Sequence, residues 1–170
     1  MKIVIIILSI ILICVILAIF FFEGKSKIND TKKKMDNANE NITNNLKEKY
    51  ELMKDLANLV KKSLKKKDYL KDFNSLKVNN LTNYELDTEL SNHLITFKNL
   101  KEDYKSLNND KYNEILQKIS LIDQELYANK RYFNKNNNKL IKDLKGYVKI
   151  VAKLLKINVK TSYEIKEPNE

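Results

Sequence analysis

The stretch LDTELSNHLITFKNLKEDYKSL, residues 86–107, decides the fold class of this chain. Its apolar residues follow one another in steps of four and three, as on one face of an α-helix. The positions on this face are Leu86, Leu90, His93, Phe97, Leu100, Tyr104 and Leu107. Thr82 and Glu85 precede it in a capping-box pattern, in which each side chain satisfies a backbone N–H at the helix start. The stretch therefore predicts a long helix that buries one face.

A first helix is predicted before this stretch. Apolar residues recur at helical spacing at Ile28, Met35, Ala38, Ile42, Leu46, Met53, Leu56, Val60 and Leu64. The same spacing continues at Tyr69, Leu70, Phe73 and Leu76. We therefore expect the first helix to continue, after a bend at most, to a turn at Asn79 and Asn80.

A third helix is predicted after it, with Asp110 as its expected N-cap. Its apolar positions are Tyr112, Leu116, Ile119, Ile122, Leu126, Phe133, Leu140 and Leu144. Gly146 is expected to end or kink this helix, and a last helical piece covers about residues 147–157.

Two glycines and one proline leave almost no turn material for a β-rich domain. Helices that are apolar on one face bury those faces against each other, and short connections make sequential neighbours antiparallel. The sequence therefore predicts an all-α fold, with an antiparallel bundle of three long helices and one short one over residues 25–160. A polar tail, residues 161–170, is expected to fray. A parallel coiled-coil oligomer is the alternative, but the turns at residues 79–80 and 108–110 break any continuous heptad.

An apolar run without any charge, IVIIILSIILICVILAIFFF at residues 3–22, precedes the helices. At about 1.5 Å per residue it matches the roughly 30 Å of hydrocarbon in a bilayer. The run ends in three phenylalanines and Glu23, without the small residues of a signal-peptide cleavage site. We therefore predict an uncleaved, single-pass transmembrane helix as an anchor over residues 1–24.

Lysines flank this run unequally. Only Lys2 precedes it, whereas five follow it closely: Lys25, Lys27, Lys32, Lys33 and Lys34. The positive-inside rule places the lysine-rich side in the cytoplasm. This predicts a protein of the cell membrane with its N-terminus outside and its helical bundle in the cytoplasm.

Residues with catalytic or metal-binding chemistry are few. His93 is the only histidine, and without nearby cysteines it cannot build a metal site, so we expect a packed core histidine. Asp87 and Glu89 are spaced for a solvated helix face. The chain has no Glu-x-x-His motif of di-metal bundles, no glycine-rich phosphate loop, and no Ser or Cys nucleophile with an evident histidine partner. The sequence therefore predicts no enzyme and no cofactor.

Positive charge is concentrated near the C-terminus. Residues 129–160 hold ten basic residues and one acid, a net charge of +9, while the whole chain carries +10. Steps of three and four predict one basic interaction face that consists of Lys135, Lys139, Lys142, Lys149, Lys153, Lys156 and Lys160. The apolar residues expected on the opposite face are Ile141, Leu144, Val148, Val151 and Leu155.

A basic amphipathic helix is typical of a contact with an anionic membrane surface or an acidic partner, or it only faces water while its apolar side completes the bundle. An alternating bundle on a stalk of roughly 60 Å would put Gly146 at the end far from the membrane. That is beyond the roughly 8 Å over which exposed charges interact. We therefore predict an acidic protein partner. Anionic lipid or nucleic acid is the alternative, although net charge alone gives only weak, salt-dependent affinity for nucleic acid.

Four short segments resemble the LemA family. ANENITNNLKEKYELMKDL at residues 38–56 is similar to the family's segment after the span, except that Asn39 replaces a tryptophan and Lys54 a proline. RYFN at 131–134, AKLLKI at 152–157 and YE at 163–164 resemble its later motifs.

The resemblance implies an N-terminal span, an α-helical bundle and no agreed biochemical activity, so we expect a scaffold or interaction protein. It also makes Arg131 and Asn134 candidate structural polar positions. Arg131 is expected either to donate two hydrogen bonds to a carboxylate or to be an ordinary surface cation. Asn134 is expected to hydrogen-bond a neighbouring helix, and residues 136–138 to face solvent.

Overall fold

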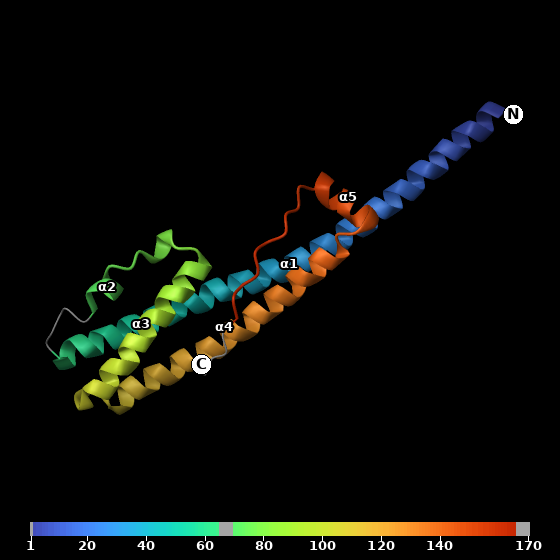
Figure 1. Ribbon diagram of the computed structural model, residues 1–170. Helices are drawn as coiled ribbons and strands as arrows, with labels where there is room; N and C mark the ends of the chain where they lie inside the picture. The colour runs from blue at the N-terminus through green and yellow to red at the C-terminus, as the bar shows by residue number, and fades with distance from the viewer. Residues whose placement is uncertain (1, 65–69, 166–170) are drawn as a thin grey trace. The chain divides into compact units, whose positions relative to one another are not determined.

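The computed structural model describes residues 2–64 and 70–165, which are almost entirely helical and contain no strand (Figure 1). The all-α prediction is therefore confirmed for this part of the chain. The elements are α1 (Lys2–Leu64), α2 (Lys71–Asn74), the short 3-10 helix η2 (Val78–Asn80), α3 (Asn83–Asp103), the 3-10 helix η3 (Lys105–Leu107), α4 (Asp110–Asp143) and α5 (Gly146–Leu154).

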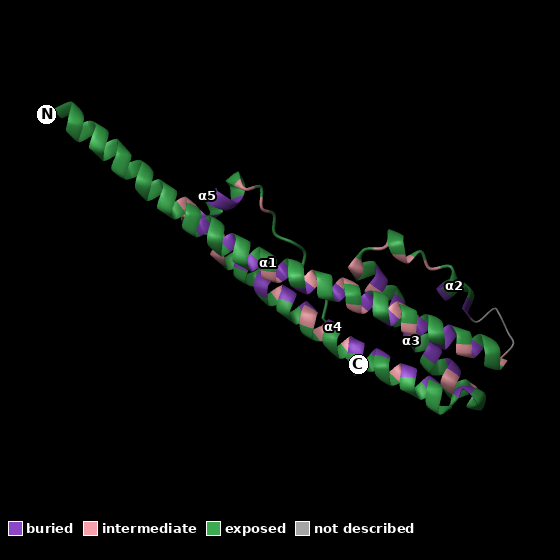
Figure 2. Ribbon diagram, turned by 180° about the vertical axis from the view of Figure 1, so that it is seen from behind, coloured by how far each residue is buried: buried purple, intermediate pink, exposed green. Residues whose placement is uncertain are grey.

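The first part of α1 carries the apolar run. Figure 2 shows it exposed from the N-terminus onward, while buried positions recur along the rest of the helix. From Ile3 to Phe22 its large apolar side chains are exposed, except for the half-buried Phe21. By length and composition, α1 is a helix that can cross a membrane. Burial in hydrocarbon would remove this apolar surface from water.

The chain divides into two compact units. One comprises Met1–Ala38 and Tyr132–Ser162, and the other comprises Asn39–Arg131 and Tyr163–Glu170. We call them the α5 unit and the α3 unit, after the helix that each contains alone.

In the α3 unit, α1, α3 and α4 bury the apolar faces that the sequence predicts. Thr43 of α1 meets Asn83 at the start of α3, and the ring of Phe73 contacts those of Tyr50 and Phe97. The buried residues include Ile42, Leu46, Met53, Leu56 and Val60 of α1, Leu86, Leu90, Leu94, Phe97 and Leu100 of α3, and Tyr112, Ile115, Ile119, Ile122 and Leu126 of α4. Ile115 takes the central position that we expected for the half-buried Leu116.

Contacts in the α3 unit set the directions of its helices. Asn45 of α1 contacts Glu125 of α4, and Lys49 of α1 contacts Asp123 of α4. Residue numbers therefore increase along α1 as they decrease along the facing part of α4. Lys130 and Tyr112 of α4 contact Asp87 and Phe97 of α3 in the same sense. These two pairs are antiparallel. α1 and α3 are therefore parallel, which differs from the expected alternation.

The reason is the segment between α1 and α3. We expected it to extend the first helix, but α1 ends at Leu64, and from Leu70 onward only the four-residue α2 and η2 interrupt irregular chain. Leu70 and Phe73 are buried as the apolar pattern indicates. The expected helical position of Tyr69 lies outside the described residues. Because this segment returns without a long helix, α3 can run in the same direction as α1.

Helix ends follow local chemistry. The expected capping box is present: Glu85 N–H donates to Thr82 Oγ1, and Thr82 N–H donates to Glu85 Oε2. α3 ends at Asp103, so Leu107 reaches its buried position from η3. The expected Asp110 cap is wrong by one position. Asn109 accepts from Tyr112 N–H at 3.0 Å through its side-chain oxygen, as an N-cap residue does.

The α5 unit holds the first part of α1, the end of α4, α5 and the chain that follows it. Its buried apolar residues are Ile28, Met35, Ala38, Phe133, Leu140, Val148, Val151 and Ala152. Gly146, the first residue of α5, has a φ of +53°, a conformation that glycine adopts without strain. The expected turn at this glycine is confirmed.

The chain after α5 is held by contacts of residues 160, 162, 163 and 164. Lys160 forms an ion pair with Asp36, and its carbonyl oxygen accepts from Asn137. Tyr163 donates to Asn39 of α1. The expected fraying is therefore wrong for residues 162–164, and residues 166–170 lie outside the described range. Short polar side chains on α1 and α4 supply the partners that hold this segment.

Candidate functional site

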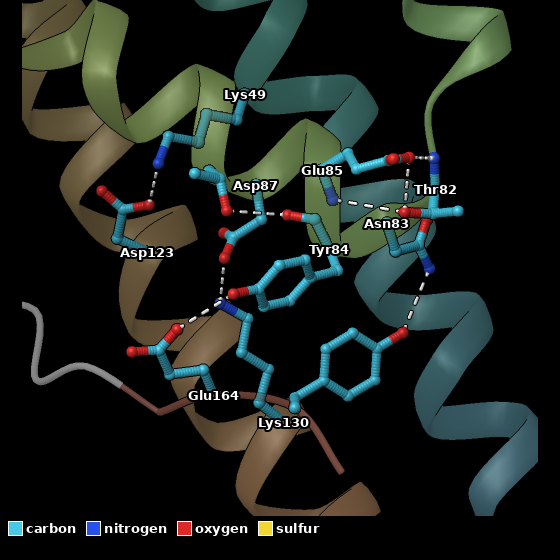
Figure 3. A network of polar contacts seen from close by, with 11 residues as sticks. Lys49, Thr82, Asn83, Tyr84, Glu85, Asp87, Asp123, Lys130 and Glu164 are labelled. Atoms are coloured by element: carbon cyan, nitrogen blue, oxygen red, sulfur yellow. Dashed lines mark hydrogen bonds and ion pairs between the residues drawn. The ribbon is translucent and has the colours of Figure 1, made fainter. Parts of the chain in front are cut away.

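A network of polar side chains crosses the interior of the α3 unit (Figure 3). Lys49, whose side chain is 2% exposed, donates to Asp123 at 2.6 Å. Lys130 donates to Asp87, also at 2.6 Å. We expected Asp87 on a solvated face, but its side chain is 22% exposed and reaches the lysine of the neighbouring helix.

The network continues to the start of α3. Tyr84 donates to Glu164 at 3.2 Å, and Asn83 donates to Thr43 at 2.8 Å and to Tyr163. The C-terminal segment and α1 are thereby joined to the N-terminus of α3, as Figure 3 shows for the labelled residues.

The chemistry of this network is that of structural support. Each buried ammonium group is held by a carboxylate, and such a charged lysine is a donor without a lone pair for nucleophilic attack. Within the described residues, no group of three or more His, Cys, Asp or Glu side chains could hold a metal ion. Tyr112 is another buried polar group; burial raises the pKa of its hydroxyl, which donates to the carbonyl oxygen of Phe97 at 2.9 Å.

Sequence reasoning missed the two buried lysines. Lys49 stands among polar residues, yet it lies three residues after Leu46 and four before Met53, on the buried stripe of α1. That position is the signal that could have identified it. Lys130 carries the same signal, because it follows Leu126 by four residues and precedes Phe133 by three.

His93 takes part in packing. Its ring meets the ring of Phe73 edge to face at 5.4 Å, and its Nε2 lies 4.0 Å from Glu89. The side chain is 16% exposed, so the histidine is at the margin of the core.

The seven lysines of the predicted basic face do not share one helix. Lys135, Lys139 and Lys142 lie on α4, Lys149 and Lys153 on α5, and Lys156 and Lys160 in the chain after α5. Gly146 divides the set, because the chain changes direction there. All seven are exposed and belong to the α5 unit, and Lys160 is ion-paired with Asp36. Of the predicted apolar face, Val148 and Val151 are buried, while Ile141 is exposed.

The expected position of Gly146 far from the apolar run is wrong. Tyr147, the next residue, lies against Phe20, and its hydroxyl accepts from Lys27 at 3.4 Å. α5 therefore packs where the apolar run ends. The expectation assumed that each long helix runs antiparallel to the one before it. Instead, the segment before α3, whose described part contains only α2 and η2, runs back along the unit, so α3 is parallel to α1.

Beside this contact, Glu23 and Lys27 form an exposed ion pair at 2.6 Å. The hydrogen bond from Lys27, together with its charge, lowers the pKa of Glu23. Hydrogen bonds with Glu23 and Tyr147 raise the pKa of Lys27. Both groups therefore stay charged at neutral pH.

The asparagine-rich turn of α4 contains two buried side chains that we expected to face solvent. Asn136 and Asn137 were expected in solvent, but both are buried. Asn136 donates to the carbonyl oxygen of Tyr132, and Asn137 donates to the carbonyl oxygen of Lys160 and to Ser162. Asn138 is exposed as expected, and Asn134 is half-buried.

Arg131 is exposed and lies over the ring of Tyr127, 5.5 Å from its centroid. Its Nη1 donates to the hydroxyl of Tyr127 at 3.5 Å. This contact is a cation–π interaction within one helix. We expected Arg131 either to bind a carboxylate or to be a surface cation. It is exposed, and the contact of its guanidinium group is with Tyr127.

Comparison of the chain with protein-family models, with curated proteins and with solved structures finds no match. The resemblance to the LemA family therefore stays a prediction.

Proposed function

We propose that this chain is a single-pass, membrane-anchored, non-enzymatic protein of the LemA type, whose helices form a bundle that acts as a scaffold for other proteins. The observation that carries the proposal is the continuity of α1. One helix runs from an exposed apolar stretch into two units with buried cores. A partner bound by these units would be held at the membrane surface.

The orientation follows from the lysines. The side after the apolar run carries Lys25, Lys27 and three lysines at residues 32–34, which favours a cytoplasmic helical part. Alkaline carbonate extraction should leave the protein in the membrane pellet. Protease added to intact cells should spare the helical part, and digestion there would contradict the orientation.

An acidic protein remains our proposed partner for the part of the basic face on α4. Lys135 stands eight residues before Asp143, where α4 ends and the chain turns into α5. This separation is about 12 Å along the helix axis. It is more than a Debye length, so charges at the α5 end of α4 act only weakly on Lys135. Lys139 lines the same hollow as Asp30, which lies eight residues and so about 12 Å beyond Phe22 of the apolar run. Both are exposed cations that an acidic surface could contact.

Crosslinking in the native cell, followed by identification of the captured proteins, tests the scaffold. We expect an acidic protein whose capture falls when Lys135→Gln and Lys139→Gln are combined, because its charged contacts are removed. The matched control is Lys98→Gln with Lys105→Gln, two exposed lysines of the α3 unit. Folded protein that captures nothing would contradict the scaffold role, and equal loss with the control would contradict the assigned face.

Anionic lipid is the second candidate ligand for the basic segment. The contact of Tyr147 with Phe20 favours it for α5, because that contact brings α5 to the end of the apolar run.

A further inference from the structure

α5 packs closely on α1 at the end of the apolar run. The ring centroids of Tyr147 and Phe20 are 5.1 Å apart. Gly24 is buried, and a Cβ atom there would lie 3.1 Å from Cγ2 of Val151. The absence of a side chain at Gly24 therefore lets α5 approach the backbone of α1. Gly24 is two residues beyond Phe22, which is only about 3 Å along the helix axis.

This position has the depth of a membrane interface. The headgroup region on each side of the hydrocarbon is about 5–8 Å thick. If α1 crosses the bilayer with residues 3–22, its contact with α5 at Gly24 and Lys27 falls within that region. Tyrosine is enriched at this depth, because its ring is apolar and its hydroxyl is polar.

α5 exposes two large apolar side chains on the stripe that also carries Tyr147. Ile150 is 64% exposed and Leu154 is 67% exposed, whereas Val148, Val151 and Ala152 are buried. Tyr147, Ile150 and Leu154 follow one another at steps of three and four, so they form one stripe. Tyr147, at the start of this stripe, reaches Phe20 of the apolar run.

Lysines occupy the adjoining surface. Lys149 and Lys153 are exposed one turn apart, next to the apolar stripe. Residues 145–156 contain four lysines and no acidic residue. Figure 1 shows α5 lying across α1 within this unit. If α1 crosses a membrane, a helix with this orientation would lie in the plane of the membrane surface. Its apolar stripe would face the hydrocarbon, and its lysines would lie at the depth of the headgroups.

We propose that α5 is an interfacial helix that binds anionic phospholipid headgroups of the same membrane in which α1 is anchored. Ile150 and Leu154 insert among the upper acyl chains, and Lys149 and Lys153 contact the phosphates. This inference rests on the proposed membrane anchor. It adds a second, lateral attachment beside the span, which fixes the rotation of α1 about its axis.

The experiment uses the full chain in liposomes and a fluorophore on one cysteine. In a Cys14→Ser background, Ile150→Cys or Leu154→Cys carries the fluorophore, and the quencher is a lipid with a nitroxide near the top of its acyl chain. The control is Leu121→Cys, an exposed apolar residue of the α3 unit. We expect strong quenching at residues 150 and 154 and little at 121. Equal, weak quenching at all three positions would overturn the proposal.

Lipid composition and charge variants test the headgroup contact. Quenching should be stronger in liposomes that contain phosphatidylglycerol than in phosphatidylcholine alone. Lys149→Gln with Lys153→Gln should remove that difference, because each lysine favours the bound state about fivefold at an anionic surface. Lys98→Gln with Lys105→Gln should not change it. Quenching that ignores both lipid charge and the α5 lysines would contradict headgroup binding.

Two further results separate the competing explanations. A fluorophore on the native Cys14, read with a lipid whose nitroxide lies near the end of its acyl chain, reports insertion of α1 itself, because Cys14 is near the middle of the run. Quenching there without quenching at residue 154 by the shallow nitroxide overturns only the interfacial helix. Loss of quenching at Cys14 would instead overturn the anchor. If residue 154 is shielded from water in native membranes but not in any liposome, a protein covers α5 and the lipid proposal is wrong.

Discussion

Lys49 shows how one residue joins two helices of the α3 unit. Its ammonium group lies in the interior and is held by Asp123 at 2.6 Å. Removing a charge from water is costly, and the carboxylate offsets part of that cost. The stability of this contact therefore depends on both partners being present.

Asp123→Asn should lower the free energy of unfolding by about 3–5 kcal/mol, because Lys49 would stay buried without a counter-charge. Urea unfolding of the detergent-solubilised chain, followed by circular dichroism, measures it. The paired change Lys49→Met with Asp123→Leu should restore most of the stability. Glu114→Gln, which breaks an exposed pair with Lys118, should have a much smaller effect. An Asp123→Asn protein as stable as the parent would contradict the role of the pair.

Asn137 acts on the segment after α5. Asn137→Ala removes two hydrogen bonds to that segment and should lower the free energy of unfolding by about 1–2 kcal/mol. Limited proteolysis should then cut the chain near residue 160 faster than in the parent. Asn138→Ala, at an exposed neighbour, is the control. Unchanged cleavage with Asn137→Ala would mean that the hydrogen bonds do not hold the segment.

At the scale of elements, the N-terminus of α3 combines a strong sequence signal with a titratable group. The backbone N–H and hydroxyl of Thr82 donate to Glu85 and lower the pKa of its carboxyl below the ordinary value of 4.5. Because the pKa is lowered in the folded state, the stabilisation is present above about pH 4.5 and is lost as pH falls through the folded-state pKa.

Glu85→Gln should therefore reduce the loss of stability between neutral pH and pH 3, since the amide cannot titrate. Urea midpoints measured over that range test this. Glu102→Gln changes an exposed carboxylate at the other end of α3 and should keep the steeper dependence of the parent. If the midpoints of Glu85→Gln and the parent fall in parallel with pH, the capping box does not carry the dependence.

The helices were predictable to different extents. α3 and its cap, most of the buried stripe of α1 and the turn at Gly146 follow from periodicity and local hydrogen bonding. The end of α1 did not follow, because Leu70 and Phe73 keep helical spacing although they pack from irregular chain and α2. Spacing alone cannot distinguish a continued helix from a segment that returns and buries the same residues.

The candidate site was less predictable because its contacts join residues far apart in the chain. The basic composition of residues 129–160 is evident from sequence, but Lys130 and Lys160 are held in ion pairs with residues elsewhere. α5, which carries Lys149 and Lys153, lies at the end of the apolar run because it packs on Gly24. Such a contact depends on the order and direction of all preceding helices, which a local pattern does not specify.

In the whole molecule, the chain leaves the apolar run along α1 and comes back to it at α5. This return brings α5, with Lys149 and Lys153, to the place where we propose that it binds anionic lipid. It depends on one tight contact, because a Cβ atom at Gly24 would lie 3.1 Å from Cγ2 of Val151, closer than an ordinary van der Waals contact.

A disulfide between residues 24 and 151 tests this return most directly. A Cβ atom at position 24 would lie 3.4 Å from that of Val151, close to the Cβ separation of about 3.8 Å in disulfides. In isolated membranes and a Cys14→Ser background, Gly24→Cys with Val151→Cys should therefore crosslink rapidly under mild oxidation. Lys25→Cys with Val151→Cys should not, because Lys25 is exposed on another side of α1. No crosslink at 24–151, or equally fast crosslinking from residue 25, would contradict the return of α5 to the end of the apolar run.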